Sequence, residues 1–591
     1  MLQTETLEHQ DRVPGLPSTD TSRVLISEIA ECIARHLSSN EVACLRFVNR
    51  EVADLFERFK AVQLEEQLPE WAVKAIFVTR WKRRESYALL MRERRGRVVG
   101  IAARCCSDVA DLEAVLAAAD APPNQQLVED AARGGNLRAC RWLTDPCRFE
   151  GRLDWRPLLS AAAGGGEQSV VDWCLEAGSY EAKESTAYAA ESAAREGHES
   201  LMEWLLAMAQ PYDGSLGRYS GICEAAFRGC SLETAQRMWE RTELPDPAND
   251  PEGWELREVL SNALVSKRDW QAKAEFLIER GVSLSTSSYR EVAELPCSGD
   301  VLERFEWLKR AGLRPCCYTL PALAARGNTA ALAWLLAEGA AADDESARQR
   351  AFETAARSGH VEALRLLTGA GWACSLPGVF EAAAEGGQAG ALQWAWDEAA
   401  ATGATVQCNL EPELFVSAAK SGSPEAMRWL SVHGGRGAKG AWAKAVESGC
   451  EAAVDVLTEL NCPKPTNGGP YGEAVNQRDW RLLPVLKRAG VSLGPPNRSS
   501  LVLQALRKGV PLSVLQWMLE EGCPAPHDWW EAVAAVRGSS GAEVGAWVRA
   551  TAEAQGPRRS STWAAEDRED CWGGSWRGPD YWEQRGHDHW Y

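Results

Sequence analysis

The stretch Ala355–Leu367, AARSGHVEALRLL, decides the fold, because the same phrase recurs along most of the chain. Two small residues, two variable ones and a glycine are followed by apolar positions that fall on one face of a helix. Clear copies have their glycine at Gly135, Gly166, Gly197, Gly359, Gly387, Gly422 and Gly449, and looser copies centre on Gly229, Gly327 and Gly509. Twelve intervals span the 374 residues from Gly135 to Gly509, which is about 31 residues each. A period near this value indicates stacked helix pairs.

Each part of the phrase has a physical reason. Paired alanines let a first helix lie close to its neighbours, and the glycine ends that helix in a left-handed conformation that costs other residues about 1–2 kcal/mol. We therefore expect structural glycines at Gly135, Gly166, Gly197, Gly327, Gly359, Gly387, Gly422 and Gly449. A further residue should close the second helix in the same way at Gly178, Gly339, Gly371, Gly434, Gly490 and Asn461. The predicted fold is an all-α solenoid of units that cannot bury their apolar faces alone.

The phrase resembles the core of the ankyrin repeat, with Ala355–Leu367 as the best copy and Ala193–Leu206 nearly as good. The resemblance covers residues 99–550, or some 14–15 degenerate units, and is closest to the tryptophan-bearing ankyrin proteins abundant in algae and other protists. The Thr-Pro-Leu-His opening of the family is absent, so we expect irregular hairpins between units. The resemblance implies a protein target bound on the concave surface.

Six tryptophans lie seven residues after a repeat glycine: Trp142, Trp173, Trp204, Trp334, Trp394 and Trp429. They could form an aromatic recognition ladder on the surface. We favour the alternative, in which they pack between neighbouring second helices, because large aromatic side chains in a repeating phase usually belong to the core.

Residues 21–60 do not fit the repeat and predict a small helical hairpin. Its apolar residues exceed what two helices can bury between themselves, so it needs a partner. The segment Leu25–Ile33 with Leu37 and Leu45–Arg50 resembles an F-box, although Ile26 stands where that family has proline. The resemblance implies that a Skp-type adaptor and a cullin bind the face made by Leu25, Ile29, Ile33, Leu37, Leu45 and Val48. The alternative is that the hairpin only caps the solenoid.

Charge and hydropathy exclude several classes of partner. The chain has 64 basic and 83 acidic residues, a formal net charge of −19, and we therefore expect no nucleic-acid partner. The longest apolar run, Ala330–Ala337, is far shorter than the roughly twenty residues of a membrane span, so we expect no membrane partner. The N-terminus lacks the features of a signal or transit peptide, which indicates a cytoplasmic or nuclear protein. Its 18 cysteines should then be reduced thiols acting as small hydrophobes.

Three segments lie outside both modules. Residues 1–20 and the Trp-, Gly- and Arg-rich tail 551–591 lack the composition of a core and are predicted to be disordered. Residues 61–98 form a predicted helical linker whose basic run, Arg80–Arg97, could meet RNA or an acidic surface. Glu85 and Glu93 interrupt that run, and we favour a solvated helix face.

No pattern in the chain indicates catalysis, a cofactor or a metal. Gly435–Gly440 matches GxGxxG, but it lies between helices of successive repeats rather than after a strand, so we interpret it as a loop. His198 and His360 follow repeat glycines and are expected to be structural, and His587 and His589 stand without a second ligand cluster. We therefore expect an interaction module that is not an enzyme. The leading hypothesis is a substrate-recruiting subunit of a cullin ubiquitin ligase, and the alternative is an ankyrin scaffold without ubiquitin chemistry.

Overall fold

The fold is seen in a computed structural model of the chain, which describes residues 77–555 apart from 147–148, 150–151, 179–181, 183, 210–216, 243, 245–252, 296–299, 340–343, 403–411, 495–500, 527 and 537–540. The chain divides into two compact units, residues 1–495 and 496–591. Every regular element in the described residues is helical, which confirms the all-α solenoid. The predicted hairpin at 21–60, with its face from Leu25 to Val48, lies outside the described residues.

Unit 1 is a series of helix pairs. The first helices are α6 (Arg92–Cys105), α8 (Gln125–Arg133), α10 (Trp155–Gly164), α13 (Thr186–Glu196), α15 (Gly217–Gly229), α17 (Trp254–Leu264), α19 (Ser287–Ala293), α21 (Leu320–Arg326), α23 (Glu345–Ser358), α25 (Leu376–Glu385), α27 (Pro412–Lys420), α29 (Gly440–Ser448) and α31 (Gly469–Asn476). The second helices are α7 (Val109–Ala119), α9 (Leu137–Leu143), α11 (Gln168–Ala177), α14 (Glu199–Met208), α16 (Leu232–Arg241), α18 (Trp270–Glu279), α20 (Asp300–Arg310), α22 (Thr329–Ala337), α24 (Val361–Gly369), α26 (Ala389–Ala401), α28 (Pro424–Val432), α30 (Glu451–Glu459) and α32 (Leu482–Arg488). Two short helices, α5 (Val78–Trp81) and η3 (Arg84–Tyr87), precede them, and η4 (Cys317–Thr319) leads into α21.

Unit 2 contains two further pairs of the same kind. They are α33 (Leu501–Arg507) with α34 (Leu512–Glu520), and α35 (Trp529–Ala535) with α36 (Gly541–Gln555). Helix α36 extends to Gln555 and buries Ala552, so the predicted boundary of the C-terminal tail at 551 falls inside a helix. Residues 556–591 lie outside the described residues.

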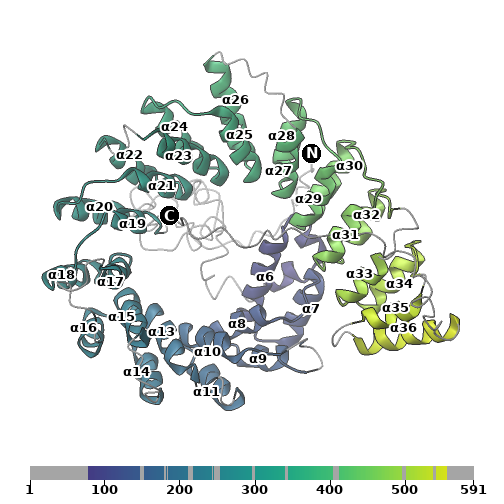
Figure 1. Cartoon of the computed structure of the whole chain (residues 1–591), viewed down its shortest axis with the longest axis horizontal. Helices are drawn as coiled ribbons and strands as arrows, with labels where there is room; N and C mark the ends of the chain where they lie inside the picture. The colour runs from purple at the N-terminus through teal and green to yellow at the C-terminus, as the bar shows by residue number, and fades with distance from the viewer. Residues whose placement is uncertain are drawn as a thin grey trace, which may run out of the picture. The chain divides into compact units, whose positions relative to one another are not determined.

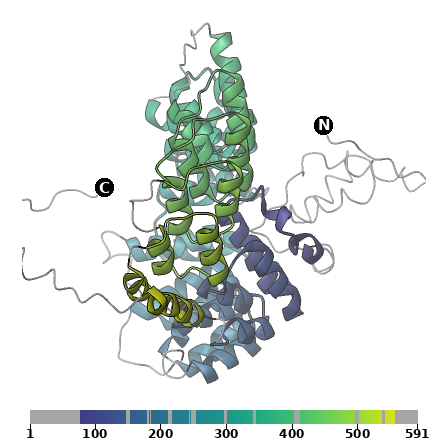
Figure 2. The ribbon, with the colours of Figure 1, turned by 90° about the vertical axis from the view of Figure 1, so that its right-hand side faces the viewer.

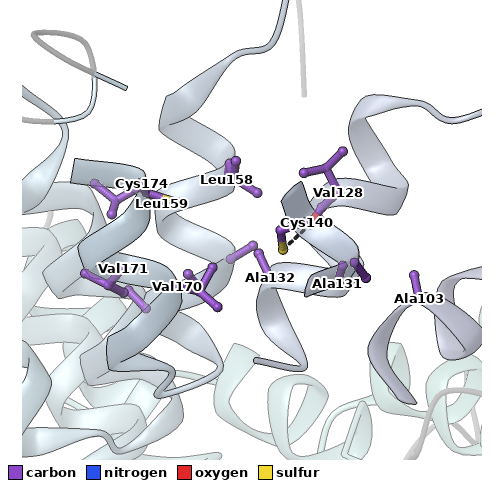
Figure 3. Packing of buried hydrophobic residues seen from close by; sticks show 14 of the residues in the cluster. Ala103, Val128, Ala131, Ala132, Cys140, Leu158, Leu159, Val170, Val171 and Cys174 are labelled. Atoms are coloured by element: carbon purple, nitrogen blue, oxygen red, sulfur yellow. Dashed lines mark hydrogen bonds between the residues drawn. The ribbon is translucent and has the colours of Figure 1, made fainter. Parts of the chain in front are cut away.

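The first helices of unit 1 form an inner row and the second helices an outer row (Figure 1). Seen from the side, the green helices of the later pairs lie one above another (Figure 2). Small residues make the inner row compact: Ala131 and Ala132 of α8 are fully buried, and they face the core that Leu158 and Leu159 of α10 also enter (Figure 3). Cys140 lies in the same core, and its thiol donates to the Val128 carbonyl at 3.9 Å.

A left-handed residue follows most first helices, where the repeat phrase places its glycine. The φ angles of Gly135, Gly166, Gly197, Gly327, Gly359, Gly387, Gly422 and Gly449 lie between 62° and 85°. Asn461 has φ 51° at the end of α30, the position for which the sequence suggested a glycine substitute. Gly178 differs, because its φ of −81° is an ordinary helical value.

Gly229 has a different role from the one its sequence suggests. It is the last residue of α15 and does not adopt positive φ. A β-carbon there would collide with the backbone carbonyls of Ala194 and Arg195 on α13. Gly386 lies against the Arg357 carbonyl in the same way. These glycines allow close approach of neighbouring first helices. The left-handed Gly387 follows Gly386, whereas Cys230, which follows Gly229, does not have a positive φ.

The residue after the left-handed glycine ties its pair to the preceding one. The Asn136 amide donates to the carbonyls of Ala103 and Cys106, both at 2.8 Å. His198 Nε2 lies 3.1 Å from the Gly164 carbonyl, and His360 Nε2 lies 3.0 Å from the Ala325 carbonyl. This confirms that the two histidines are structural, and burial lowers the pKa of His360, which favours its neutral form.

The beginning of unit 1 contacts pairs near its end, which we call the closing contact. The amide of Ala452 donates to the Ala88 carbonyl at 3.0 Å, although 364 positions separate these residues. Arg95 of α6 is buried and donates to the buried Asp479, and Arg92 donates to Gln477 at 2.6 Å. Figure 1 shows α6 beside α29 and α31.

The closing contact imitates the tie between ordinary pairs. Arg478 has φ 55° and takes the place of the glycine, so Asp479 stands where His198 and His360 stand in their repeats. An aspartate carboxylate cannot donate to a carbonyl, and Asp479 accepts from Arg95 instead. The space next to Gly449 is filled by Arg92 and Arg95, each with an atom 3.0 Å from where a β-carbon would lie.

The basic run at 80–97 is therefore more than the solvated face that we favoured. Arg92 and Arg95 point into the closing contact, whereas Arg97 pairs with Glu93 at the surface. The sequence does not reveal this, because their partner lies 384 residues away. The Gly435–Gly440 segment connects α28 to α29, as the loop interpretation requires.

Substitution of Gly359 by valine should lower the free energy of unfolding by about 1–3 kcal/mol. A β-branched side chain is strained at φ 79°, and its β-carbon would collide with Gln388 of the next pair. Chemical denaturation would measure the loss. Gly369→Ala is the matched control, because Gly369 is helical with open space around it, and this variant should be neutral or slightly stabilised.

Substitution of Arg95 by methionine should cost about 3–5 kcal/mol, because it leaves the Asp479 carboxylate buried without its main partner. Adding Asp479→Leu should recover part of this loss, so the double variant should be more stable than the sum of the single effects predicts. Denaturation of the three variants gives the coupling. The surface control Arg97→Met should change stability by less than about 1 kcal/mol, and an equal loss in both arginine variants would contradict a buried closing contact.

Candidate functional site

The exposed face of the inner row carries two rows of opposite charge. Glutamates stand six residues before the left-handed position at Glu129, Glu191, Glu353 and Glu381, and Glu224 stands six residues before the equivalent residue Cys230. Basic residues stand two residues before the same positions at Arg133, Arg195, Arg228, Arg357 and Lys420. A spacing of four brings the two kinds onto one helix face, with the acid nearer the helix N-terminus as the helix dipole favours. Arg195 donates to Glu191 at 2.6 Å in this way.

Four carboxylates of α13, α15 and α17 lie near one another. Burial together with the nearby carboxylates of Glu258, Glu191 and Glu255 raises the pKa of Glu224 to about 7. Arg195, Arg228 and Arg257 lie on the same three helices and partly balance these carboxylates. This part of the face favours a partner that brings positive charge.

A pocket of about 530 Å³ lies between α6 and α8, at the start of the same row. Its charged lining residues are Glu93, Arg97, Arg104, Asp130 and Arg133, and Ile101 and Leu127 provide apolar wall. Arginines outnumber carboxylates in this lining, whereas acidic residues outnumber basic ones in the chain as a whole.

Arg104 and Asp130 form the centre of the pocket. Arg104 Nη2 donates to Asp130 Oδ1 at 2.5 Å, and Arg133 lies 4.0 Å from the same carboxylate. Asp130 is buried and packs against the β-carbon position of Gly100, so a larger residue at 100 would displace it. The Arg104 Nε is buried without a hydrogen-bond partner.

We did not predict this pocket from the sequence, although the sequence contains a signal for it. Asp130 stands five residues before its left-handed glycine. The same position holds a small or hydroxyl residue in Ala161, Ser192, Ala322, Thr354, Ala382 and Ser417. A buried acid in place of these residues requires a cation, and Arg104 is one repeat earlier.

The tryptophans of the repeat mostly pack, as we favoured. Trp142 and Trp173 are partly buried against the core, and Trp394 is only 8% exposed. Trp429 Nε1 donates to Gln393 of the neighbouring second helix at 2.8 Å. Trp204 is the most exposed of the six, at 37%.

Exposed aromatic side chains occur on the inner row instead. Tyr188 of α13 is 53% exposed and shares a helix face with Glu191 and Arg195. Trp254 begins α17, and Tyr318 lies in η4 just before α21, and both are about 60% exposed. Aromatic residues and arginines dominate binding hot spots, so these positions mark the inner row as a surface for contact.

The described residues give little evidence for a metal site or for a reactive lysine or cysteine. No group of three or more potential metal ligands occurs there. Lys273 has a pKa lowered to about 8 by burial, but it is fully buried and donates to the Cys230 carbonyl at 2.6 Å and to Ser266 at 2.8 Å. It therefore ties neighbouring pairs together. The cysteines in this part of the chain are free thiols, and burial raises the pKa of Cys140 to about 12.

No family model matches the chain, and no curated protein matches it either. Among solved structures, the chain is similar to the pentatricopeptide repeat protein PPR10 in complex with an 18-nt psaJ RNA element, at 14% identity and TM-score 0.24, over 90% of this chain and 97% of that one. A cysteine-to-serine variant of the complex gives 12%, 0.24, 90% and 96%, and PPR10 from maize gives 14%, 0.23, 89% and 80%. Similarity at this level assigns neither a repeat family nor a ligand to this chain.

Our exclusion of nucleic acid as a partner is corrected by these findings. Two of the similar helical-repeat structures are RNA complexes. The exclusion was also wrong in physical terms, because a net charge of −19 does not describe each local surface. The arginines of the α6–α8 pocket show this directly. Concerning membranes, the described residues contain no helix that is both long and apolar enough to span one.

Proposed function

We propose that this chain is a non-catalytic binding scaffold that holds a protein partner along the inner row of unit 1. The observation that carries the proposal is the combination of exposed Tyr188, Trp254 and Tyr318 with paired charges on one continuous row of first helices. A protein surface offers both the apolar groups that cover aromatic anchors and the charges that complement the acidic and basic rows.

We also propose that the repeats are of the ankyrin type. The phrase at Ala355–Leu367 and the left-handed glycines favour a degenerate ankyrin repeat, whose units in this chain differ in loop length. Stacked repeats present long surfaces on which side chains vary freely, since the buried positions alone maintain the fold. Recognition is therefore expected from the exposed positions of first helices.

Site-specific photocrosslinking in cells tests where the partner binds. A photoreactive phenylalanine analogue at Tyr188 or Trp254 should form a crosslink to a discrete protein. The same analogue at Val432, which is 81% exposed on the outer helix α28, should not. Tyr188→Ala should then weaken binding of the captured protein about tenfold, as expected for a hot-spot residue. Crosslinks from Val432 alone would place the partner on the outer row and contradict the proposal.

A narrower hypothesis makes the chain a substrate-recruiting subunit of a cullin ubiquitin ligase. It rests on the F-box-like sequence at Leu25–Arg50, which lies outside the described residues. In that hypothesis the apolar residues at 25–48 bind a Skp-type adaptor, and the inner row binds the protein to be modified.

The double substitution Ile29→Lys and Ile33→Lys distinguishes an adaptor-binding motif from a cap. In an F-box, two charges in an apolar interface should cost several kcal/mol of adaptor binding and leave the melting temperature unchanged. In a cap, the same pair should lower the melting temperature. Co-purification of a Skp-type adaptor and thermal unfolding are measured on both forms, and failure of the wild type to retain an adaptor would refute the ligase hypothesis.

A further inference from the structure

The pocket between α6 and α8 points to a ligand chemistry that the rest of the inner row does not share. We propose that it binds a carboxylate on an acidic peptide segment of the partner protein, with Arg104 and Arg133 as the residues that hold it. This inference rests on the proposed function and specifies what one part of the partner must carry.

Arg104 provides one guanidinium. Its pairing with Asp130 is made through Nη2, and its side chain lines the pocket. A guanidinium has five N–H donors in a planar fork, so one carboxylate partner does not exhaust it. About a third of the Arg104 side chain remains exposed, so its other Nη donors are available to an incoming carboxylate oxygen.

Arg133 provides a second guanidinium at the rim. It is half exposed, and it lies 4.0 Å from Asp130, beyond hydrogen-bonding distance. Guanidinium groups bind carboxylates in a bidentate geometry with short, charge-assisted hydrogen bonds. Two arginines that share one buried aspartate therefore leave donors for a second anion.

The size and lining of the pocket favour a peptide over a nucleic acid. A volume of about 530 Å³ exceeds a single carboxylate, and Ile101 and Leu127 would contact the aliphatic part of an acidic side chain. Glu93 and Asp130 are already paired with Arg97 and Arg104, so Arg133 carries the excess positive charge of the pocket, which suits one carboxylate better than the successive phosphates of a nucleic acid.

The test measures binding of a fluorescein-labelled hexaglutamate peptide to the full chain by fluorescence anisotropy at 0.15 M salt, with hexaglutamine as the uncharged probe. Arg133→Gln should weaken binding about tenfold, since it removes charge-assisted hydrogen bonds. Gln126→Glu, which adds a negative charge to the pocket lining, should weaken it similarly. The matched control is Arg195→Gln, because Arg195 holds the same repeat position as Arg133 on α13, and it should bind within twofold of the wild type.

Equal affinities for Arg133→Gln and Arg195→Gln would overturn the assignment of the peptide to this pocket. Binding of a labelled oligouridylate that Arg133→Gln abolishes, without binding of hexaglutamate, would assign the pocket to nucleic acid instead. Crosslinks from Tyr188 are recorded in parallel. If they persist while hexaglutamate fails to bind, the proposed scaffold function stands and the acidic-peptide inference alone is wrong.

Discussion

The structure of unit 1 depends on a two-residue arrangement at the end of most first helices. A left-handed residue stops the helix, and the next residue donates from its side chain to a carbonyl of the preceding pair, as Asn136 and His198 do. A positive φ turns the chain within one residue, and glycine adopts it without strain. One backbone conformation thus determines both where a pair ends and how it is joined to its neighbour.

The closing contact shows that the same geometry accepts other side chains. Arg478 adopts the left-handed conformation at a cost that glycine would avoid, and Asp479 reverses the direction of the hydrogen bond by accepting from Arg95. Arg481 completes the contact: it donates to Glu451, and its guanidinium carbon lies 5.6 Å from the ring centre of the buried Tyr87. Burying so many charges is costly unless they are paired, so this contact contributes specificity of position more than simple cohesion.

Sequence periodicity was sufficient to predict the helix pairs, because each pair is specified by residues within about thirty positions of one another. The phrase at Ala355–Leu367 contains its own cap, turn and apolar face. The role of Gly229 was misassigned because a packing glycine and a turning glycine stand one residue apart in the phrase. The closing contact could not be predicted, since nothing local distinguishes Arg95 from the exposed Arg97. The α6–α8 pocket could have been predicted in part, because an acid stands at 130 where six other repeats have a small or hydroxyl residue.

Arrays of repeats usually tolerate a change in copy number, because each unit touches only its neighbours and the ends are free. The contact between α6 and the α29–α31 pairs removes that freedom from unit 1. Packed helices are spaced by roughly 10 Å, so loss or duplication of any intervening pair would shift Asp479 away from Arg95 by about the thickness of one helix. The number of pairs between residues 92 and 481 is thus itself a structural parameter, and length variation should be confined to loops such as the one between α26 and α27. In unit 1, the number of helix pairs therefore determines whether Arg95 can reach Asp479.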